Sequence, residues 1–282
     1  MRNDSPRCAL SKAEKCKRNI CFGVVVCCVA AVLAIEISDI EFADDALLSP
    51  MLSSSVSRLI GAAALITVAA YLEYRVFDPF RKPFLRSLIF VLPCLAVAVN
   101  NFPIVGVVTG NVRLAQPVSY VSALILQCFA IGLFEELAFR GVMLPVILER
   151  RRKTLSDVFV SVCLTSAVFG AIHLINLFAG AGLLSVVLQI GYSFLIGGMC
   201  SVVLLKTHNI WYCVLIHSAF DFGGLFVSTL GEGNPWDGLT VSITVILALA
   251  VAVYVTVAFI KLDPRSIDGI YHKNISPEME KE

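Results

Sequence analysis

Three short patterns of ionisable residues lie inside strongly apolar stretches of this 282-residue chain. They are Glu135-Glu136-x-x-x-Arg140, Phe169-x-x-x-His173 and His217-x-x-x-Asp221. A charged side chain at the centre of a membrane helix costs about 2.5–3.5 kcal/mol on insertion scales, so such residues indicate function. Gathered inside one helix bundle, these groups could pair with each other and hold a water molecule in a pocket of low dielectric. Together, the three patterns predict a hydrolytic site.

The first pattern separates a paired carboxylate from an unpaired one. On a helix, Glu136 and Arg140 are four residues apart and share a face, so they can form an ion pair. Glu135 points about 100° away from Glu136 and is left for another partner. A buried carboxylate without a charge partner suits a general base that works near neutral pH. Taken alone, this pattern is also consistent with an interfacial ion-pair cluster near Glu149 and Arg150.

The second and third patterns each place two side chains one helical turn apart. Phe169 and His173 share a face, and Asn176 lies on nearly the same stripe. A lone histidine in a membrane helix is often a hydrogen-bonding contact between helices, and Phe169 is most simply a packing residue. His217 and Asp221 reach one point, although alone they could form a structural pair. Three such patterns in three separate spans favour a common site over scattered polar contacts.

The composition places the chain among membrane proteins. Hydrophobic residues make up 58% of the chain and charged residues 15%, and the mean hydropathy is +0.85. Soluble domains have about 45–50% apolar and about 25% charged residues. The chain has no basic, aromatic patch, so we predict no nucleic-acid partner; the net charge of +1 does not bear on this. None of the ten cysteines forms a CxxC pair, and we interpret them as small buried hydrophobes without a disulfide or metal role.

About eight stretches are long and apolar enough to cross a hydrocarbon core, which takes about 20 residues. They are 20–37, 57–77, 86–106, 117–147, 156–177, 184–205, 209–230 and 239–260. Turn residues separate several of them, namely Ser49-Pro50, Asp78-Pro79, Gly180-Ala181-Gly182 and Gly231–Pro235. The sequence predicts an all-α polytopic bundle with a single transmembrane domain, 20–261, between polar tails 1–19 and 262–282. We expect the long stretch 117–147 to bend, tilt or continue past the lipid.

The basic residues predict the orientation of the bundle. Nineteen of the 22 Lys and Arg residues lie in the two tails and in every second connection between the predicted spans. These segments are 1–19, 73–86, 149–155, 206–208 and 261–282. The intervening loop 38–56 is acidic. The positive-inside rule therefore predicts cytoplasmic N- and C-termini and an even number of spans. Residues 1–36 could instead be a signal peptide, but the apolar run is long and no good A-x-A site ends it.

Several other chemistries lack their sequence patterns. The chain has no HExxH zinc-protease helix, no GxGD motif, no P-loop and no dinucleotide fingerprint. Gly191-Tyr192-Ser193-Phe194 is only loosely similar to a serine nucleophile turn, and its glycines are better interpreted as packing residues. A transporter with a midplane polar relay is also disfavoured, because no inverted repeat is visible.

The order of the three patterns on successive spans resembles the CPBP family. This family joins the CAAX prenyl proteases with bacteriocin-processing and self-immunity proteins, also called Abi proteins. The resemblance covers about residues 117–230, and its most specific part is Phe134-Glu135-Glu136-Leu137-Ala138-Phe139-Arg140-Gly141. It implies an intramembrane glutamyl endopeptidase of a bacterial cell membrane, with a membrane-associated peptide or protein as substrate.

The resemblance also implies a role for each residue of the patterns. Glu135 and His173 would hold and activate the attacking water. His217, together with Asp221, would stabilise the oxyanion. The supporting residues are Glu136, Arg140, Phe169 and Asn176. A water activated by glutamate needs no metal, so no cofactor is predicted; the alternative is zinc at the Glu/His cluster.

One residue departs from the pattern of the prenyl-processing members. These carry Asn at the last position, whereas this chain has Asp221. An Asn amide donates a hydrogen bond to an oxyanion, and an ionised Asp repels it. Asp221 therefore disfavours prenyl processing and leaves peptide or bacteriocin processing, or self-immunity. The alternative function is a non-catalytic immunity or partner-binding protein on the same scaffold, and the sequence does not give the substrate or the oligomeric state.

Overall fold

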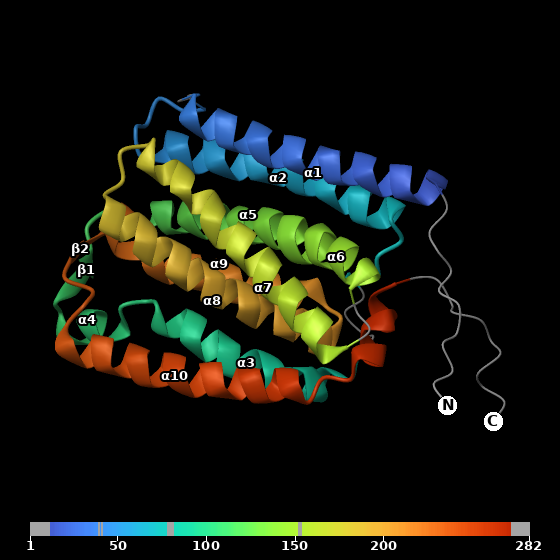
Figure 1. The fold of residues 1–282 in the computed structure, drawn as a ribbon. Coiled ribbons are helices and arrows are strands. Elements are labelled where there is room, and N and C mark those ends of the chain that lie inside the picture. The colour runs from blue at the N-terminus through green and yellow to red at the C-terminus, as the bar shows by residue number, and fades with distance from the viewer. Residues whose placement is uncertain (1–11, 39, 41, 78–81, 152–153, 272–282) are drawn as a thin grey trace.

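The computed structural model describes residues 12–38, 40, 42–77, 82–151 and 154–271, and these form a bundle of long helices (Figure 1). The α-helices are α1 Lys12–Ile37, α2 Leu48–Tyr71, α3 Phe84–Asn100, α4 Ile104–Thr109, α5 Ser119–Glu136, α6 Leu144–Arg150, α7 Leu155–Ile172, α8 Leu183–Thr207, α9 Ile210–Leu230 and α10 Gly238–Ile260. The other elements are a π-helix Leu137–Met143, 3-10 helices His173–Leu177 and Pro264–Ile270, and strands β1 Val112–Leu114 and β2 Gly231–Gly233.

The all-α polytopic bundle predicted from the sequence is confirmed. Seven helical segments of the described chain are long and apolar enough to cross a bilayer. The segment predicted as a span at 86–106 is instead the shorter apolar helix α3, followed by a turn and the short helix α4. α3 does not continue through that turn. Pro103 lies there, and a proline has no backbone N–H with which to extend a helix. The predicted break at Asp78-Pro79 falls outside the described residues.

α2 begins at Leu48 rather than at the predicted residue 57. The Asp45 carboxylate caps its start by accepting from the N–H groups of Leu47 and Leu48, at 2.9 and 2.8 Å. In the serine-rich stretch after it, buried hydroxyl groups are satisfied by bonds back to helix carbonyls, as Ser55 Oγ donates to Met51 O at 2.6 Å. Pro50, expected in a turn, lies in the first turn of α2, where proline is tolerated.

The long stretch predicted at 117–147 is an unbroken helical segment, Ser119–Glu149. Its middle part, Leu137–Met143, is a π-helix, and the Leu144 N–H bonds to the carbonyl of Phe139, five residues back. Such a widened turn is uncommon and often occurs at functional sites. Here it carries Arg140 and directly follows the two glutamates of the first pattern.

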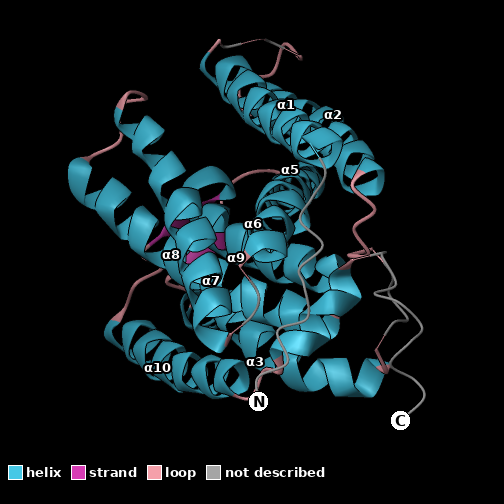
Figure 2. Cartoon of the chain, turned by 45° about the vertical axis from the view of Figure 1, so that its right-hand side comes forward, coloured by secondary structure: helices cyan, strands magenta, loops and turns pink. Residues whose placement is uncertain are grey.

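α5 and α9 form the centre of the bundle. Figures 1 and 2 show α1 and α2 on one side, α3 and α10 on the other, and α5, α7, α8 and α9 between them. α5 packs against α2 and α9. The contact with α9 is close at Gly132, where an added Cβ would lie 2.6 Å from Ser218 Oγ. This approach brings the end of α5, with its two glutamates, against His217 of α9.

Polar contacts join the segments that were predicted to be cytoplasmic. Arg18 of α1 bridges to Glu149 of α6 at 2.8 Å, and Lys206 Nζ donates to the carbonyl of Lys261 at 2.9 Å. The described chain starts and ends at this side of the bundle, and the β1–β2 ribbon lies at the opposite end (Figure 1). The antiparallel ribbon, which the sequence analysis did not predict, links the start of α5 to the end of α9. Three described basic residues of these segments, Arg18, Lys206 and Lys261, thus lie at this end, and the assignment of that end to the cytoplasm stays a prediction.

Candidate active site

His217 lies where the first and third patterns meet. Its Nδ1 is 2.7 Å from Glu136 Oε1. Its Nε2 is 3.6 Å from Glu135 Oε2 and 3.5 Å from Asp221 Oδ2. The imidazole is 4% exposed and is thus enclosed by three carboxylates from two helices. The structure brings together the residues that the sequence analysis had selected from separate spans.

Glu136 links two of the patterns through one oxygen. Its Oε1 accepts from Arg140 Nη1 at 2.9 Å and also faces His217 Nδ1. Glu136 and Arg140 are both fully buried, and the four-residue spacing predicted their ion pair. The second partner of Glu136 was not predicted, because it lies 81 residues further along the chain. As the acceptor of Nδ1, Glu136 fixes the imidazole ring and leaves Nε2 for the open side of the site.

Glu135 has the geometry of a carboxylate that is free to bind another molecule. Its side chain is 18% exposed. The 3.6 Å separation from His217 Nε2 is too long for a direct hydrogen bond and is a distance at which a water molecule can bridge. Glu135 therefore differs sharply from its neighbour Glu136, which is buried and paired, as the sequence spacing predicted.

His173 reaches the site across the ring of Phe169. The Phe169 ring centroid lies 5.6 Å from that of His173 and 5.7 Å from that of His217, with both pairs edge-on. The Arg140 guanidinium lies over the same ring at 4.5 Å. His173 interacts electrostatically with His217 and Asp221. Phe169 is thus a packing residue, as expected, and it sets the spacing between the two imidazoles and Arg140.

Asn176 does not join the ionisable cluster directly. α7 ends at Ile172, and Asn176 lies in the following 3-10 helix. Its Nδ2 donates to Gln189 Oε1 of α8 at 2.8 Å. This contact joins the segment of His173 to α8, and the supporting role of Asn176 stays a prediction.

Arg58 of α2 lies near the cluster and was not among the candidate site residues predicted from the sequence. It is 8% exposed and forms an ion pair with Glu36 of α1. Its charge also interacts electrostatically with Glu135 and Asp221. The sequence signal that could have found it is an arginine directly after a serine-rich stretch, because α2 begins at Leu48, next to the Asp45 cap, and so includes Arg58 well inside the helix.

Residues 117–223 match the family described as Type II CAAX prenyl endopeptidase Rce1-like. The chain carries an Rce1-like domain. The match confirms the resemblance to the CPBP family and indicates a protease-type domain at these residues, and the apolar helices of the described chain support an integral membrane protein. No curated protein and no solved structure matches the chain. The Rce1-like domain contains every residue of the three patterns, whereas Glu36 and Arg58 precede it.

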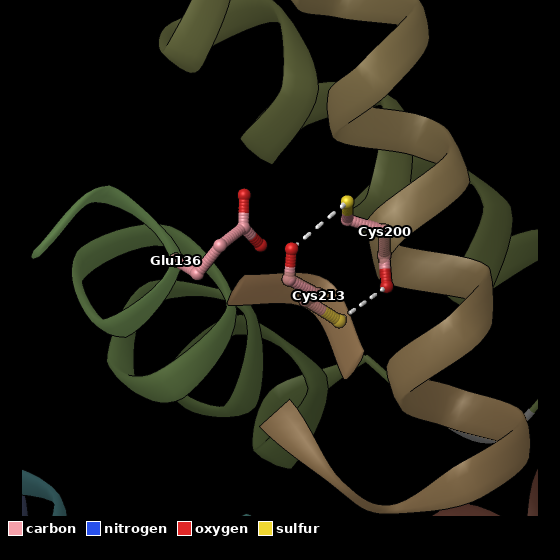
Figure 3. A group of neighbouring side chains, drawn as sticks. All are labelled: Glu136, Cys200 and Cys213. Carbon is pink, nitrogen blue, oxygen red and sulfur yellow. Dashed lines mark hydrogen bonds between the residues drawn. The ribbon is translucent and has the colours of Figure 1, made fainter. Parts of the chain in front are cut away.

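One group in the described part of the Rce1-like domain has ligand atoms close enough to hold a metal ion. Glu136, Cys200 and Cys213 are buried, and their ligand atoms lie within 4.8 Å of one another. Figure 3 shows that the two cysteines face each other's backbone: Cys213 Sγ donates to Cys200 O at 3.2 Å, and Cys200 Sγ to Cys213 O at 4.0 Å. These contacts make the thiols packing contacts between α8 and α9. The described cysteines are free thiols.

The close fit of α8 around Arg140 gives a first prediction. A Cβ at Gly197 would lie 2.5 Å from Arg140 Nη2 and 3.1 Å from Ser166 Oγ. Because Glu136 and Phe169 hold Arg140, Gly197→Ala is expected to destabilise the protein by about 1–3 kcal/mol. The matched control is Gly191→Ala on the same helix, where a Cβ meets nothing within 4 Å. Thermal unfolding in detergent compares the two variants, and equal midpoints would contradict the prediction.

Proposed function

We propose that the Rce1-like domain hydrolyses a peptide bond of a membrane-associated substrate, with Glu135 as the general base. One observation carries the proposal: Glu135, the accessible carboxylate, faces the free nitrogen of a histidine whose other nitrogen is fixed by Glu136. A water molecule held by Glu135 and His173 would be placed to attack a carbonyl carbon whose oxygen faces His217 Nε2. General bases of this kind contribute about 10²–10⁴-fold to a rate.

The proposed reaction conserves protons within the site. Glu135 takes a proton as the water oxygen bonds to the carbonyl carbon, and the carbonyl oxygen becomes an oxyanion. His217 presents Nε2 to the oxyanion, and His173 orients the water. Glu135 then returns the proton to the leaving amine as the C–N bond breaks. Burial of these groups among apolar helices strengthens each electrostatic contact.

We propose that this reaction needs no metal ion. The support is that Glu136 Oε1 already serves Arg140 and His217, so the ring is oriented without one. The alternative is zinc at His217 Nε2 with Glu135 and Asp221, since imidazole and carboxylates are zinc ligands. Inhibition of purified protein by a zinc chelator, with recovery on adding zinc, would favour the alternative.

Asp221 gives a second prediction. Its Oδ2 is buried without a hydrogen-bond partner among the described residues and lies near the proposed oxyanion. Asp221→Asn is expected to keep or raise the rate of peptide hydrolysis, because an amide donor replaces an acid. Asp221→Ala is expected to lower the rate about tenfold, because His217 loses the carboxylate that lies 3.5 Å from its Nε2 and helps to orient it. The two variants are compared on one peptide substrate, and an inactive Asn variant would point to a ligand role instead.

The proposed function is tested by peptidomics of membranes that contain the wild-type protein or Glu135→Gln. We expect peptides that are released only with the wild type, and their sequences give the substrate class. A farnesyl-cysteine peptide and its unlipidated form, added to the same membranes, test the prenyl-processing class that the family description names. Identical peptide sets in both membranes would refute proteolysis and leave a non-catalytic binding function.

A further inference from the structure

Arg58 is a buried cation outside the Rce1-like domain and beside its site. Its Nη1 contacts Glu36 of α1 and Ser54 Oγ of α2, the latter at 2.6 Å. The guanidinium Nε is buried and has no hydrogen-bond partner among the described residues. A guanidinium has five donors arranged for bidentate contact with a carboxylate, so its hydrogen-bonding capacity is only partly used.

The charges around Arg58 indicate what it can bind. Arg58 lies about one helical turn before Gly61 of α2, where an added Cβ would lie 2.6 Å from Phe134, the residue before Glu135. The Arg58 charge also interacts with the carboxylates of Glu135 and Asp221. A substrate anion entering there would meet repulsion from these two carboxylates unless a cation offset it. Arg140 is fully buried and bonded to Glu136, so it is not available for this purpose. Arg140 also has two donors without a partner among the described residues, Nε and Nη2, but its side chain is 1% exposed, whereas that of Arg58 is 9% exposed.

Glu36 shows that a carboxylate fits at Arg58. It lies at the end of α1, and its side chain is 31% exposed, whereas the side chain of Arg58 is 9% exposed. If a carboxylate of another molecule replaced the more exposed carboxylate of Glu36, the buried guanidinium of Arg58 would still have an anionic partner. Pairing matters here, because an uncompensated charge inside a membrane bundle is costly.

We propose that Arg58 binds a carboxylate of the substrate and that Glu36 occupies this position in the free protein. The proposal rests on the proposed function and deepens it, since it gives the chemistry of one substrate group. The carboxylate can be the C-terminus of the substrate or an acidic side chain. A C-terminal carboxylate would place the cleaved bond close to the end of the substrate chain.

Binding to non-hydrolysing protein tests this proposal separately from catalysis. The full chain with Glu135→Gln, in detergent, is titrated with a fluorescent farnesyl-cysteine tetrapeptide that lacks acidic side chains. One form has a free C-terminal carboxylate, a second a C-terminal carboxamide, and a third the carboxamide with an added Glu. We expect at least one of the two carboxylate-bearing forms to bind about tenfold or more tightly than the plain carboxamide. Which form binds tightly identifies the source of the carboxylate.

Variants of the ion pair separate recognition from structure. Arg58→Gln should abolish the preference for the carboxylate, and Arg58→Lys should keep part of it. Glu36→Gln removes the internal competitor and should tighten binding of the acid form severalfold without affecting the carboxamide. If Arg58 and Glu36 only fasten α1 to α2, both Gln variants lower the melting temperature and neither changes the preference. Binding of all three forms with equal affinity, or of none, overturns the proposal, whereas lost cleavage with the preference intact would count only against the proposed function.

Discussion

Replacing Glu135 by Gln is expected to lower peptide hydrolysis by about 10²–10⁴-fold, because the amide cannot take a proton from water. The fold should persist, since Glu135 is partly exposed and makes no direct hydrogen bond to His217. The substitution keeps the size of the side chain, so the loss is expected in kcat more than in KM. The measurement is the steady-state rate on a quenched peptide, combined with thermal unfolding of each variant.

The matched control for Glu135→Gln is Glu232→Gln. Glu232 is an exposed carboxylate of the β1–β2 ribbon, and it pairs there with Arg113. Loss of an exposed ion pair costs about 0–1 kcal/mol, so the control should keep both activity and stability. Full activity of Glu135→Gln would remove Glu135 from the mechanism and leave His217 or a metal-bound water as the candidate.

Spacing along one helix allowed the sequence to predict the contacts within each pattern. Glu136 pairs with Arg140 and His217 approaches Asp221 because residues four apart share a helix face. The contact between Glu136 and His217 could not be derived in this way, because it depends on how α5 packs on α9. The glycine at position 132 permits that approach, but a glycine in a helix does not identify its neighbour.

Arg58 and Asn176 show two other limits of the sequence. The serine-rich start of α2 was left out of the predicted span because serine has low hydropathy. A hydropathy scale does not account for hydroxyl groups that form hydrogen bonds within the helix. Arg58 therefore stood at the very start of the predicted span 57–77 and was not selected as a site residue. Asn176 was placed on the stripe of His173 by assuming that α7 continues, whereas α7 ends one residue before His173. The orientation, the catalytic roles and the substrate stay predictions.

Arg140→Ala is expected to destabilise the protein by about 3–5 kcal/mol, the usual cost of breaking a buried ion pair. It leaves the fully buried Glu136 with His217 as its remaining partner and removes the cation above Phe169. The control Arg113→Ala breaks an exposed pair and should cost about 0–1 kcal/mol. Thermal unfolding in detergent measures both changes.

The double variant Arg140→Ala with Glu136→Gln separates stability from catalysis. Removing the uncompensated carboxylate should restore part of the lost stability, because the amide that replaces it carries no buried charge. Hydrolysis should stay about 10²-fold low, since the neutral amide holds His217 less firmly and small misplacements of a catalytic group cost this much. Independent, additive effects on stability would show that Glu136 and Arg140 do not act as a pair. Recovery of activity along with stability would mean that Glu136 does not orient His217, and that Asp221 performs this role.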